Sequence, residues 1–166
     1  MKLIAAVDKN KGIGANNALL YRIPDDMKFF REKTLGKVVV CGHNTLKSFK
    51  DGKPLQGRTN IVLSRGGKPI DGAVVCSSLD ELLKKLAEYP TDDIYVIGGQ
   101  TVYDLLIDYC DTACITEIDA ISYADKFLTK LYASPSWSLA EESDIKEYDD
   151  IKYRFCTYKN GFVTPR

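Results

Sequence analysis

The sequence predicts an α/β fold: a single-domain sandwich with a mainly parallel sheet of about eight strands, an antiparallel hairpin at its C-terminal edge and about four flanking helices. Three patterns predict this architecture. Short apolar runs alternate with amphipathic segments as far as about residue 120. Several of these runs are apolar on both faces, which is typical of strands that helices cover on both sides. Beyond residue 120 only alternating, period-two patterns remain, as expected for an antiparallel edge.

Length and charge set the limits of this fold. The 166 residues can bury one core, and we expect a single domain over residues 1–160. Residues 161–166 have no pattern and are expected to be a frayed tail or a remnant of expression. The 23 basic and 23 acidic side chains balance, so the composition gives no reason to expect nucleic acid or an anionic membrane as a partner.

The sequence gives no sign of export. Its first 20 residues lack an uninterrupted apolar segment, and no later run approaches the length needed to span a membrane. The five cysteines are an odd set without a Cys-x-x-Cys motif, and several lie within apolar runs. They are Cys41, Cys76, Cys110, Cys114 and Cys156. We therefore expect buried thiols in a protein of the reducing cytoplasm.

The first half of the chain predicts strands over residues 2–7, 37–41 and 58–64, with a charged, glycine-containing loop after the first of them. A helix is expected to begin at Pro24, because proline suits the first helical position. Two acidic residues in its first turn complement the positive end of the helix dipole. A second, short helix is expected over residues 46–49.

The second half continues the alternation. The pattern Ser78-x-x-Glu81 is a capping box that opens a helix over residues 79–89, and a further helix is expected over 101–107. Strands are expected over 73–77, 93–97 and 110–119, and an end hairpin is expected to include residues 137–139 and 153–158.

The helix that begins at Pro24 carries the first candidate site residue. At about 100° per residue, its apolar arc is expected to be buried and consists of Ile23, Met27, Phe30 and Thr34. Asp26 lies about 40° from Phe30, whereas Asp25 points to the opposite side. Burial would raise the pKa of Asp26, and a lone carboxylate beside aromatic rings could anchor a flat, nitrogen-rich ligand. The alternative is that Asp26 only stabilises the start of the helix.

Two strand-to-helix junctions have the features of phosphate sites. Gly98-Gly99-Gln100-Thr101 and Gly42-His43-Asn44-Thr45 each place a glycine directly after an apolar strand, where free N–H groups at a helix start favour an anion. Two such junctions would suit a pyrophosphate. Tight turns would explain the same glycines, since neither junction is a Gly-x-Gly-x-x-Gly or a Walker motif.

The remaining residues favour cofactor chemistry over nucleophilic catalysis. His43 is the only histidine, so the sequence predicts no multi-histidine metal site, and no metal is expected. No serine lies in a Gly-x-Ser-x-Gly elbow, and the cysteines lack a histidine base unless Cys41 meets His43. One buried acid and a bound dinucleotide suffice for hydride transfer, in which the protein supplies position and electrostatic field.

From Leu3 to about Tyr158 the chain resembles the dihydrofolate reductase family. The resemblance rests on nine short motifs in order: residues 4–8, Gly12-Ile13-Gly14, residues 23–30, residues 42–45, residues 54–60, Leu63-Ser64-Arg65, residues 95–99, Val102-Tyr103 and residues 115–119. It implies NADPH-dependent reduction of 7,8-dihydrofolate to tetrahydrofolate, by hydride transfer to C6 and protonation of N5. It also implies a role in one-carbon and thymidylate metabolism and a target for antifolates.

The resemblance also assigns roles to residues. Asp26 would bind the pteridine ring, assisted by Thr116, and Arg58 would bind the glutamate carboxylate of the substrate. Other substrate contacts would come from Ile4, Ala6, Met27, Phe30, Phe49 and Ile97. The cofactor would contact Ala6, Ile13, Gly14, Gly42, His43, Asn44, Thr45, Leu63, Ser64, Arg65, Gly98, Gly99, Gln100, Thr101, Val102 and Tyr103. The family has a cis peptide between the two glycines and a loop, here residues 8–21, that closes over the nicotinamide.

Two departures from the family pattern concern the site. Leu20-Tyr21 replaces the usual Pro-Trp, and Tyr21 is expected to orient a catalytic water through its hydroxyl group. His43 stands where many members have arginine, so Arg65 would carry more of the charge that attracts the 2′-phosphate.

Three alternatives stay open: a reductase of the same fold that acts on an aminopyrimidine sugar phosphate, a non-catalytic protein that binds NADPH and pterin, and a structural or signalling domain. No segment demands a partner chain, so a monomer is expected.

Overall fold

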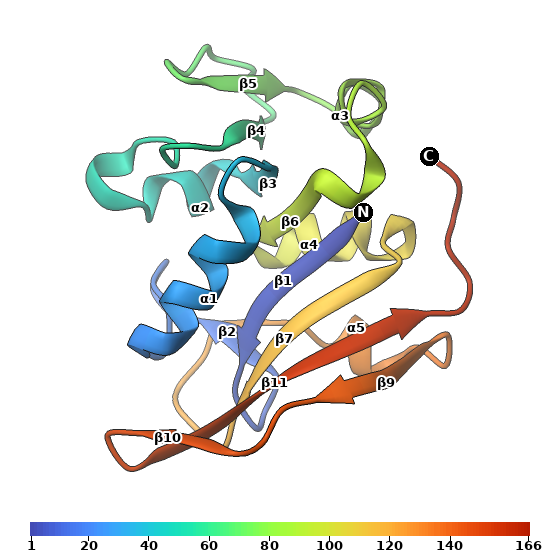
Figure 1. Cartoon of the computed structure of the whole chain (residues 1–166). Helices are drawn as coiled ribbons and strands as arrows, with labels where there is room; N and C mark the ends of the chain where they lie inside the picture. Colours follow the sequence, from blue (N-terminus) through green and yellow to red (C-terminus); the bar gives the residue numbers. More distant parts are fainter.

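The computed structural model describes residues 1–166 and is built around one nine-stranded sheet (Figure 1). The strand order is β10-β11-β7-β1-β6-β3-β4-β5, and β9 pairs with β11 beside this path. Their bounds are β1 Lys2–Val7, β3 Val38–Gly42, β4 Thr59–Leu63, β5 Ala73–Cys76, β6 Ile94–Gly98, β7 Thr112–Ile118, β9 Trp137–Glu142, β10 Lys146–Tyr148 and β11 Ile151–Asn160. A small second sheet pairs β2 (Gly12–Gly14) with β8 (Lys126–Phe127).

The strand directions confirm the predicted fold class. The pairings among β1, β3, β4, β5, β6 and β7 are all parallel, whereas β11 runs antiparallel to β7, β9 and β10. The crossovers between parallel strands contain the helices, except that residues 64–72 join β4 to β5 without one, and the antiparallel strands need only short turns. The C-terminal part of the chain therefore forms the edge of the sheet, as predicted.

Helices cover both faces of the sheet. They are α1 Pro24–Thr34, α2 His43–Lys47, α3 Leu79–Leu86, α4 Gln100–Leu106 and α5 Lys130–Ala133, with single 3₁₀ turns at Lys50–Gly52, Thr91–Asp93 and Ile107–Tyr109. The main core contains buried side chains of α3, α4 and α5. Side chains of α1 and α2 pack with smaller clusters on the other face, and Figure 1 shows α1 in front of the strands and α4 behind them. No helix is both long and apolar enough to cross a membrane.

The fold differs from the predicted one in its short elements. There are five α-helices, and α5 was missed because a single turn of four residues is too short for a helical period to appear. The pairing of β2 with β8 was also missed, since two such short strands carry no alternation of their own. The predicted helix over residues 79–89 ends earlier, at Leu86.

The capping box of α3 is only half as expected. The Ser78 hydroxyl accepts a hydrogen bond from the Glu81 N–H, at 3.1 Å. The Glu81 carboxylate, however, accepts from the backbone N–H and the hydroxyl of Ser77 rather than from the N–H of Ser78. The reciprocal bond is therefore shifted by one residue.

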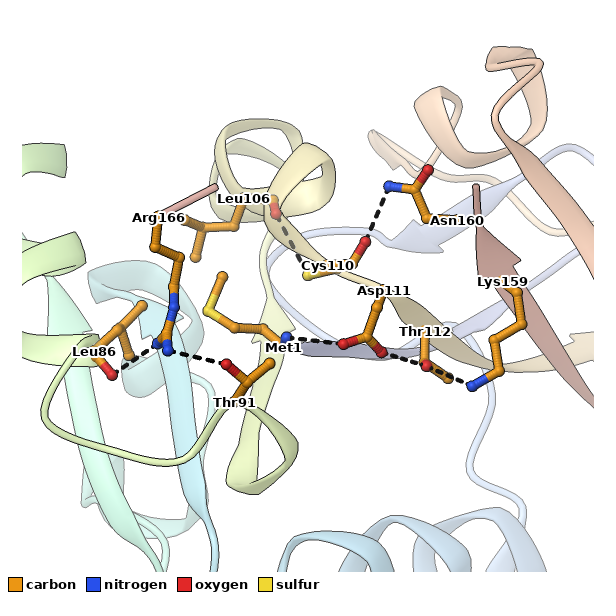
Figure 2. A network of polar contacts seen from close by, with 10 residues as sticks. All are labelled: Met1, Leu86, Thr91, Leu106, Cys110, Asp111, Thr112, Lys159, Asn160 and Arg166. Atoms are coloured by element: carbon orange, nitrogen blue, oxygen red, sulfur yellow. Dashed lines mark hydrogen bonds and ion pairs between the residues drawn. The ribbon is translucent and has the colours of Figure 1, made fainter. Parts of the chain in front are cut away.

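The five cysteines are free and buried, as predicted. Cys110 lies in a polar network at the amino edge of the sheet (Figure 2), where its carbonyl oxygen accepts a hydrogen bond from Asn160. In the same network the terminal amine of Met1 lies 3.4 Å from the Asp111 carboxylate. The Arg166 guanidinium donates to the carbonyl of Leu86 and to the Thr91 hydroxyl. The last residues of the chain are thus hydrogen-bonded to the connection between α3 and β6.

Candidate active site

The candidate site lies at the carboxyl edge of the parallel strands, where open α/β sheets bind ligands. Strand pairing aligns the elements that meet there. Ala6 of β1 is paired with Thr116 of β7, and Cys41 of β3 is paired with Gly98 of β6. The helix α1 leads away from this edge, with Asp26 in its first turn.

Asp26 and Thr116 form the polar centre of the site. The Thr116 hydroxyl donates a hydrogen bond to Asp26 Oδ1 at 2.5 Å, although the two residues are 90 positions apart. Thr116 is fully buried, and Asp26 is half-buried. The other oxygen, Asp26 Oδ2, has no protein hydrogen-bond donor assigned to it, so it remains available to a donor on a ligand.

The surroundings of Asp26 favour its neutral form more than water does. Burial raises the pKa of the Asp26 carboxyl, the hydrogen bond from Thr116 opposes that rise, and the negative charge of Asp25 adds to it. Asp25 itself is exposed and accepts a hydrogen bond from the Tyr153 hydroxyl at 3.0 Å. The two adjacent acids therefore lie in different environments, as the helical wheel predicted.

An apolar wall adjoins this carboxylate. Phe30 and Ile97 pack against the cluster that contains Ile4, and Ile97 also packs, with Phe49, against a neighbouring cluster. The structure thus brings together four of the predicted lining residues. The prediction that Met27 is buried was wrong: Met27 is 45% exposed, because Phe29 and Phe30 are the side chains of α1 that pack against this cluster.

Arg58 lies at the end of the same wall. Its Nε donates to the Thr34 hydroxyl at 3.2 Å and its Nη1 to the Gln56 carbonyl at 2.8 Å, while its Cζ lies 6.0 Å from the centre of the Phe30 ring. Burial lowers the pKa of the guanidinium, and the positive charge of Arg31 lowers it further. These two hydrogen bonds fix the orientation of the Arg58 guanidinium plane and leave its Nη2 free to donate to a ligand.

The two glycine junctions are neighbours in space. A Cβ added to Gly99 would lie 3.2 Å from Thr45 Oγ1, and one added to Gly42 would lie 3.3 Å from Val102 Cγ2. The Gly98–Gly99 peptide is cis, as the resemblance implied. A side chain at Gly42 or Gly99 would therefore crowd a residue of the other junction, so the two junctions lie side by side.

Tyr103 closes this region from the side of the core. It is buried, and its hydroxyl donates to the carbonyl of Ile4 at 2.7 Å. Burial raises the pKa of Tyr103, and the nearby Cys41 and Asp26 raise it further. The phenol is therefore a neutral hydrogen-bond donor.

The other predicted cofactor residues lie around the two junctions, at the ends of β3 and β4 and in β2. Gly42 at the end of β3 pairs with Leu63 at the end of β4. His43 and Ser64, the next residue after each, therefore lie at neighbouring strand ends. His43, Asn44, Arg65 and Thr101 are exposed. The Gln100 side chain accepts a hydrogen bond from the Phe127 N–H at 2.9 Å, which directs it to the β8 segment. Ile13 and Gly14 belong to β2, which pairs with β8.

Asp8 is a buried polar residue that the sequence reasoning passed over. It is only 2% exposed, and its carboxylate accepts hydrogen bonds from the N–H groups of Asn10, Gly12 and Ser122. The spacing from Asp8 to Gly12 is a signal that could have identified it, because an aspartate before a glycine turn commonly accepts hydrogen bonds from the next residues. Asp8 and Tyr21 also line one small cavity.

The fold and this site define an α/β protein that holds its ligand at the carboxyl edge of a parallel sheet, against one half-buried carboxylate. Comparisons with known proteins give the family. The family model described as dihydrofolate reductase matches residues 1–160. The chain belongs to the dihydrofolate reductase family and is an oxidoreductase, and membership supports the reduction of dihydrofolate to tetrahydrofolate with a nicotinamide cofactor.

Relatives from bacteria and a plant agree with this assignment. The chain is 36% identical to the dihydrofolate reductase of Neisseria meningitidis serogroup B over 94% of this chain and 95% of that protein. It is 35% identical to the type 3 dihydrofolate reductase of Salmonella typhimurium, over 92% of each. The bifunctional dihydrofolate reductase-thymidylate synthase of Daucus carota is 31% identical over 95% of this chain, which spans only 33% of that longer protein.

Proposed function

We propose that this protein reduces 7,8-dihydrofolate to 5,6,7,8-tetrahydrofolate with NADPH, and that Asp26 is the residue on which catalysis depends. The observation that carries the proposal is the half-buried Asp26 carboxylate, bonded to Thr116 and placed beside an apolar wall. In the cell the product would support one-carbon and thymidylate metabolism. We also infer that the protein is a monomer and that it works in the cytoplasm.

The residues at the two glycine junctions fit a dinucleotide. Gly42, Gly98 and Gly99 leave no side chain between the start of α2 and the start of α4, so a pyrophosphate could approach the backbone N–H groups. Thr45 would add its hydroxyl group. His43, Ser64 and Arg65, at the ends of β3 and β4, would hold the adenosine phosphate. When bound, NADPH supplies the hydride that reduces C6.

Asp26 and Thr116 would bind the pteridine through complementary hydrogen bonds. The hydroxyl proton of Thr116 is used in the bond to Asp26 Oδ1. Thr116 Oγ1 and Asp26 Oδ2 can therefore each accept a hydrogen bond from a ligand. The ring N3–H and the 2-amino group of the substrate are donors. This pairing fixes the orientation of the ring, and Ile4, Phe30 and Ile97 exclude water from its faces.

Asp26 would also act through its charge. Protonation of N5 from solvent makes the ring positive in the reacting state, and a fixed carboxylate in an environment of low dielectric stabilises that charge. Tyr21 would orient the water that delivers the proton. Arg58, whose guanidinium plane is held by Thr34 and Gln56, would bind the glutamate carboxylate of the substrate.

The decisive experiment measures steady-state oxidation of NADPH, and of NADH for comparison, with dihydrofolate as the substrate. Asp26→Asn keeps the shape of the side chain and removes its charge, so kcat at neutral pH should fall roughly 100- to 1000-fold. Part of the activity should return in acid, where the substrate can bind already protonated.

Asp25→Asn is the matched control, because it removes the neighbouring charge at an exposed position of the same helix turn. It should keep the parent activity within a few-fold. Equal activity of Asp26→Asn and the parent protein would exclude the role proposed for Asp26, and a parent protein without activity would exclude the proposed function.

A further inference from the structure

The segment that precedes Tyr21 contains a buried carboxylate without a cation. Asp8 Oδ1 accepts hydrogen bonds from the N–H groups of Asn10 at 2.9 Å and Gly12 at 2.8 Å. The two nearest lysines in sequence are engaged elsewhere. Lys9 Nζ lies 3.3 Å from the Asp119 carboxylate, and Lys11 Nζ lies 3.9 Å from the centre of the Tyr132 ring. The hydrogen bonds that Asp8 accepts all come from backbone N–H groups, and its negative charge also acts on the polar side chains beside it.

The polar group beside it is Tyr21. Both residues line a cavity of about 10 Å³, which is close to the space that a single water needs. The other lining residues are apolar side chains or glycine: Ala6, Gly12, Ile13, Leu19, Leu20 and Ile118. Within this cavity the phenol of Tyr21 and the carboxylate of Asp8 are thus the two polar side chains that can interact, directly or through one water.

A third residue joins this pair from a distant loop. The backbone N–H of Ser122 donates to Asp8 Oδ2 at 3.3 Å, and the Ser122 side chain lies close enough to Tyr21 to influence the pKa of the phenol. Burial raises the pKa of Tyr21, the charge of Asp8 raises it further, and the Ser122 side chain lowers it. The phenol therefore stays protonated, and the negative charge of Asp8 attracts its proton.

We propose that Asp8 and Ser122 are positioning residues that act through Tyr21: together they set the direction of its hydroxyl group, so that it can orient the water at the substrate. This inference rests on the proposed function, in which Tyr21 orients the water that delivers the proton. Because Asp8 and Ser122 come from two different loops, the Tyr21 hydroxyl is correctly directed only when these loops are docked. Further backbone bonds, from Lys9 to Ala120 and from Asp125 to Gly14, hold them together.

The test compares single and double variants. Asp8→Asn keeps an oxygen that can accept from Gly12 and removes the charge, and Ser122→Ala removes only the hydroxyl, since its backbone N–H remains. Each should lower kcat about 3- to 30-fold with little change in KM, as coupled neighbouring side chains do. In a Tyr21→Phe background the same two substitutions should have almost no further effect on kcat. Asp119→Asn, a loss of one charge at a 60% exposed carboxylate of the same loop, is the control and should leave kcat unchanged.

A second readout is independent of activity. In protein labelled with fluorotyrosine, the ¹⁹F resonance that is missing from Tyr21→Phe belongs to Tyr21. It should shift in Asp8→Asn and in Ser122→Ala and stay in place in Asp119→Asn. Additive losses of kcat in the Tyr21→Phe background, or an unmoved Tyr21 resonance, would overturn the inference. An inactive parent protein would instead refute the proposed function and leave the ¹⁹F result to decide the inference.

Discussion

At the scale of single residues, the site depends on two adjacent acids with opposite surroundings. Asp25 is exposed and bonded to the Tyr153 hydroxyl, whereas Asp26 is half-buried beside Phe30 and bonded to Thr116. A rotation of about 100° along the helix separates them. The difference in burial alone decides which carboxylate can bind a ligand away from water.

Burial of Asp26 has a consequence for stability. Because burial raises the pKa of its carboxyl, the folded chain holds this proton more tightly than the unfolded chain does. The free energy of unfolding therefore falls as the pH rises from the ordinary carboxyl range through the raised pKa, and it stays lowered at neutral pH. Asp26→Asn should thus stabilise the protein at pH 7, by roughly 0.5–2 kcal/mol, the usual range for a stabilising substitution.

Thermal unfolding across the pH range checks this prediction. The stability that Asp26→Asn gains over the parent protein should shrink as the pH falls. It should vanish at a pH where the Asp26 carboxyl of the parent is protonated in both the folded and the unfolded chain. Asp25→Asn should show a smaller gain at pH 7, since it removes only the weaker repulsion between the two carboxylates and leaves Asp26 buried and charged. A destabilised Asp26→Asn at neutral pH would contradict the reasoning.

At the scale of elements, the candidate cofactor site depends on the close approach of two helix starts. A Cβ added to Gly99, just before α4, would lie 3.2 Å from Thr45 Oγ1 in α2, and β3 pairs with β6 beside these helix starts. Each junction alone is a tight turn. On the proposed function, their adjacency would let the backbone N–H groups of both junctions hold the two phosphates of the cofactor.

Gly99→Ala should therefore weaken cofactor binding. The added Cβ would lie 3.2 Å from Thr45 Oγ1, so the two junctions must separate slightly. We expect the Kd for NADPH to rise about tenfold, which corresponds to about 1.4 kcal/mol, as measured by fluorescence titration. Gly66→Ala is the control, because no atom lies within 4 Å of its added Cβ. Equal Kd values for the two variants would argue against a pyrophosphate at this junction.

At the scale of the whole molecule, the candidate active site and the polar contacts that hold the chain termini lie at opposite edges of the sheet. The site lies at the carboxyl edge, whereas the network of Met1, Asp111 and Arg166 lies at the amino edge (Figure 2). Residues 161–166 have no regular secondary structure, but three of them are hydrogen-bonded: Gly161 to Ser136, Thr164 to Asp108 and Arg166 to Leu86 and Thr91.

Removal of residues 161–166 should accordingly affect stability and spare activity. The loss of these hydrogen bonds should cost on the order of 1–3 kcal/mol in the free energy of unfolding, measured by urea titration. Arg166→Ala should account for part of that loss. The kcat of both variants should equal that of the parent protein, and a marked fall in kcat would show that the two edges are coupled.

The sequence by itself determined the order of the elements, the α/β class, the start of α1 at Pro24, the placement of Asp26 and the two glycine junctions. These features are written in local patterns, such as periodicity, capping residues and glycines after strands, which need no knowledge of distant contacts. It missed α5 and the pairing of β2 with β8, because elements this short carry no period.

Only the tertiary structure decided which distant residues meet. Thr116 reaches Asp26 across 90 positions, Arg58 is held by Thr34, and Ser122 meets Asp8 across 114 positions. Met27 is exposed although it shares the apolar arc of α1. The register of the strands and the docking of the loops fix these relations, and both depend on packing of the whole chain rather than on any local pattern.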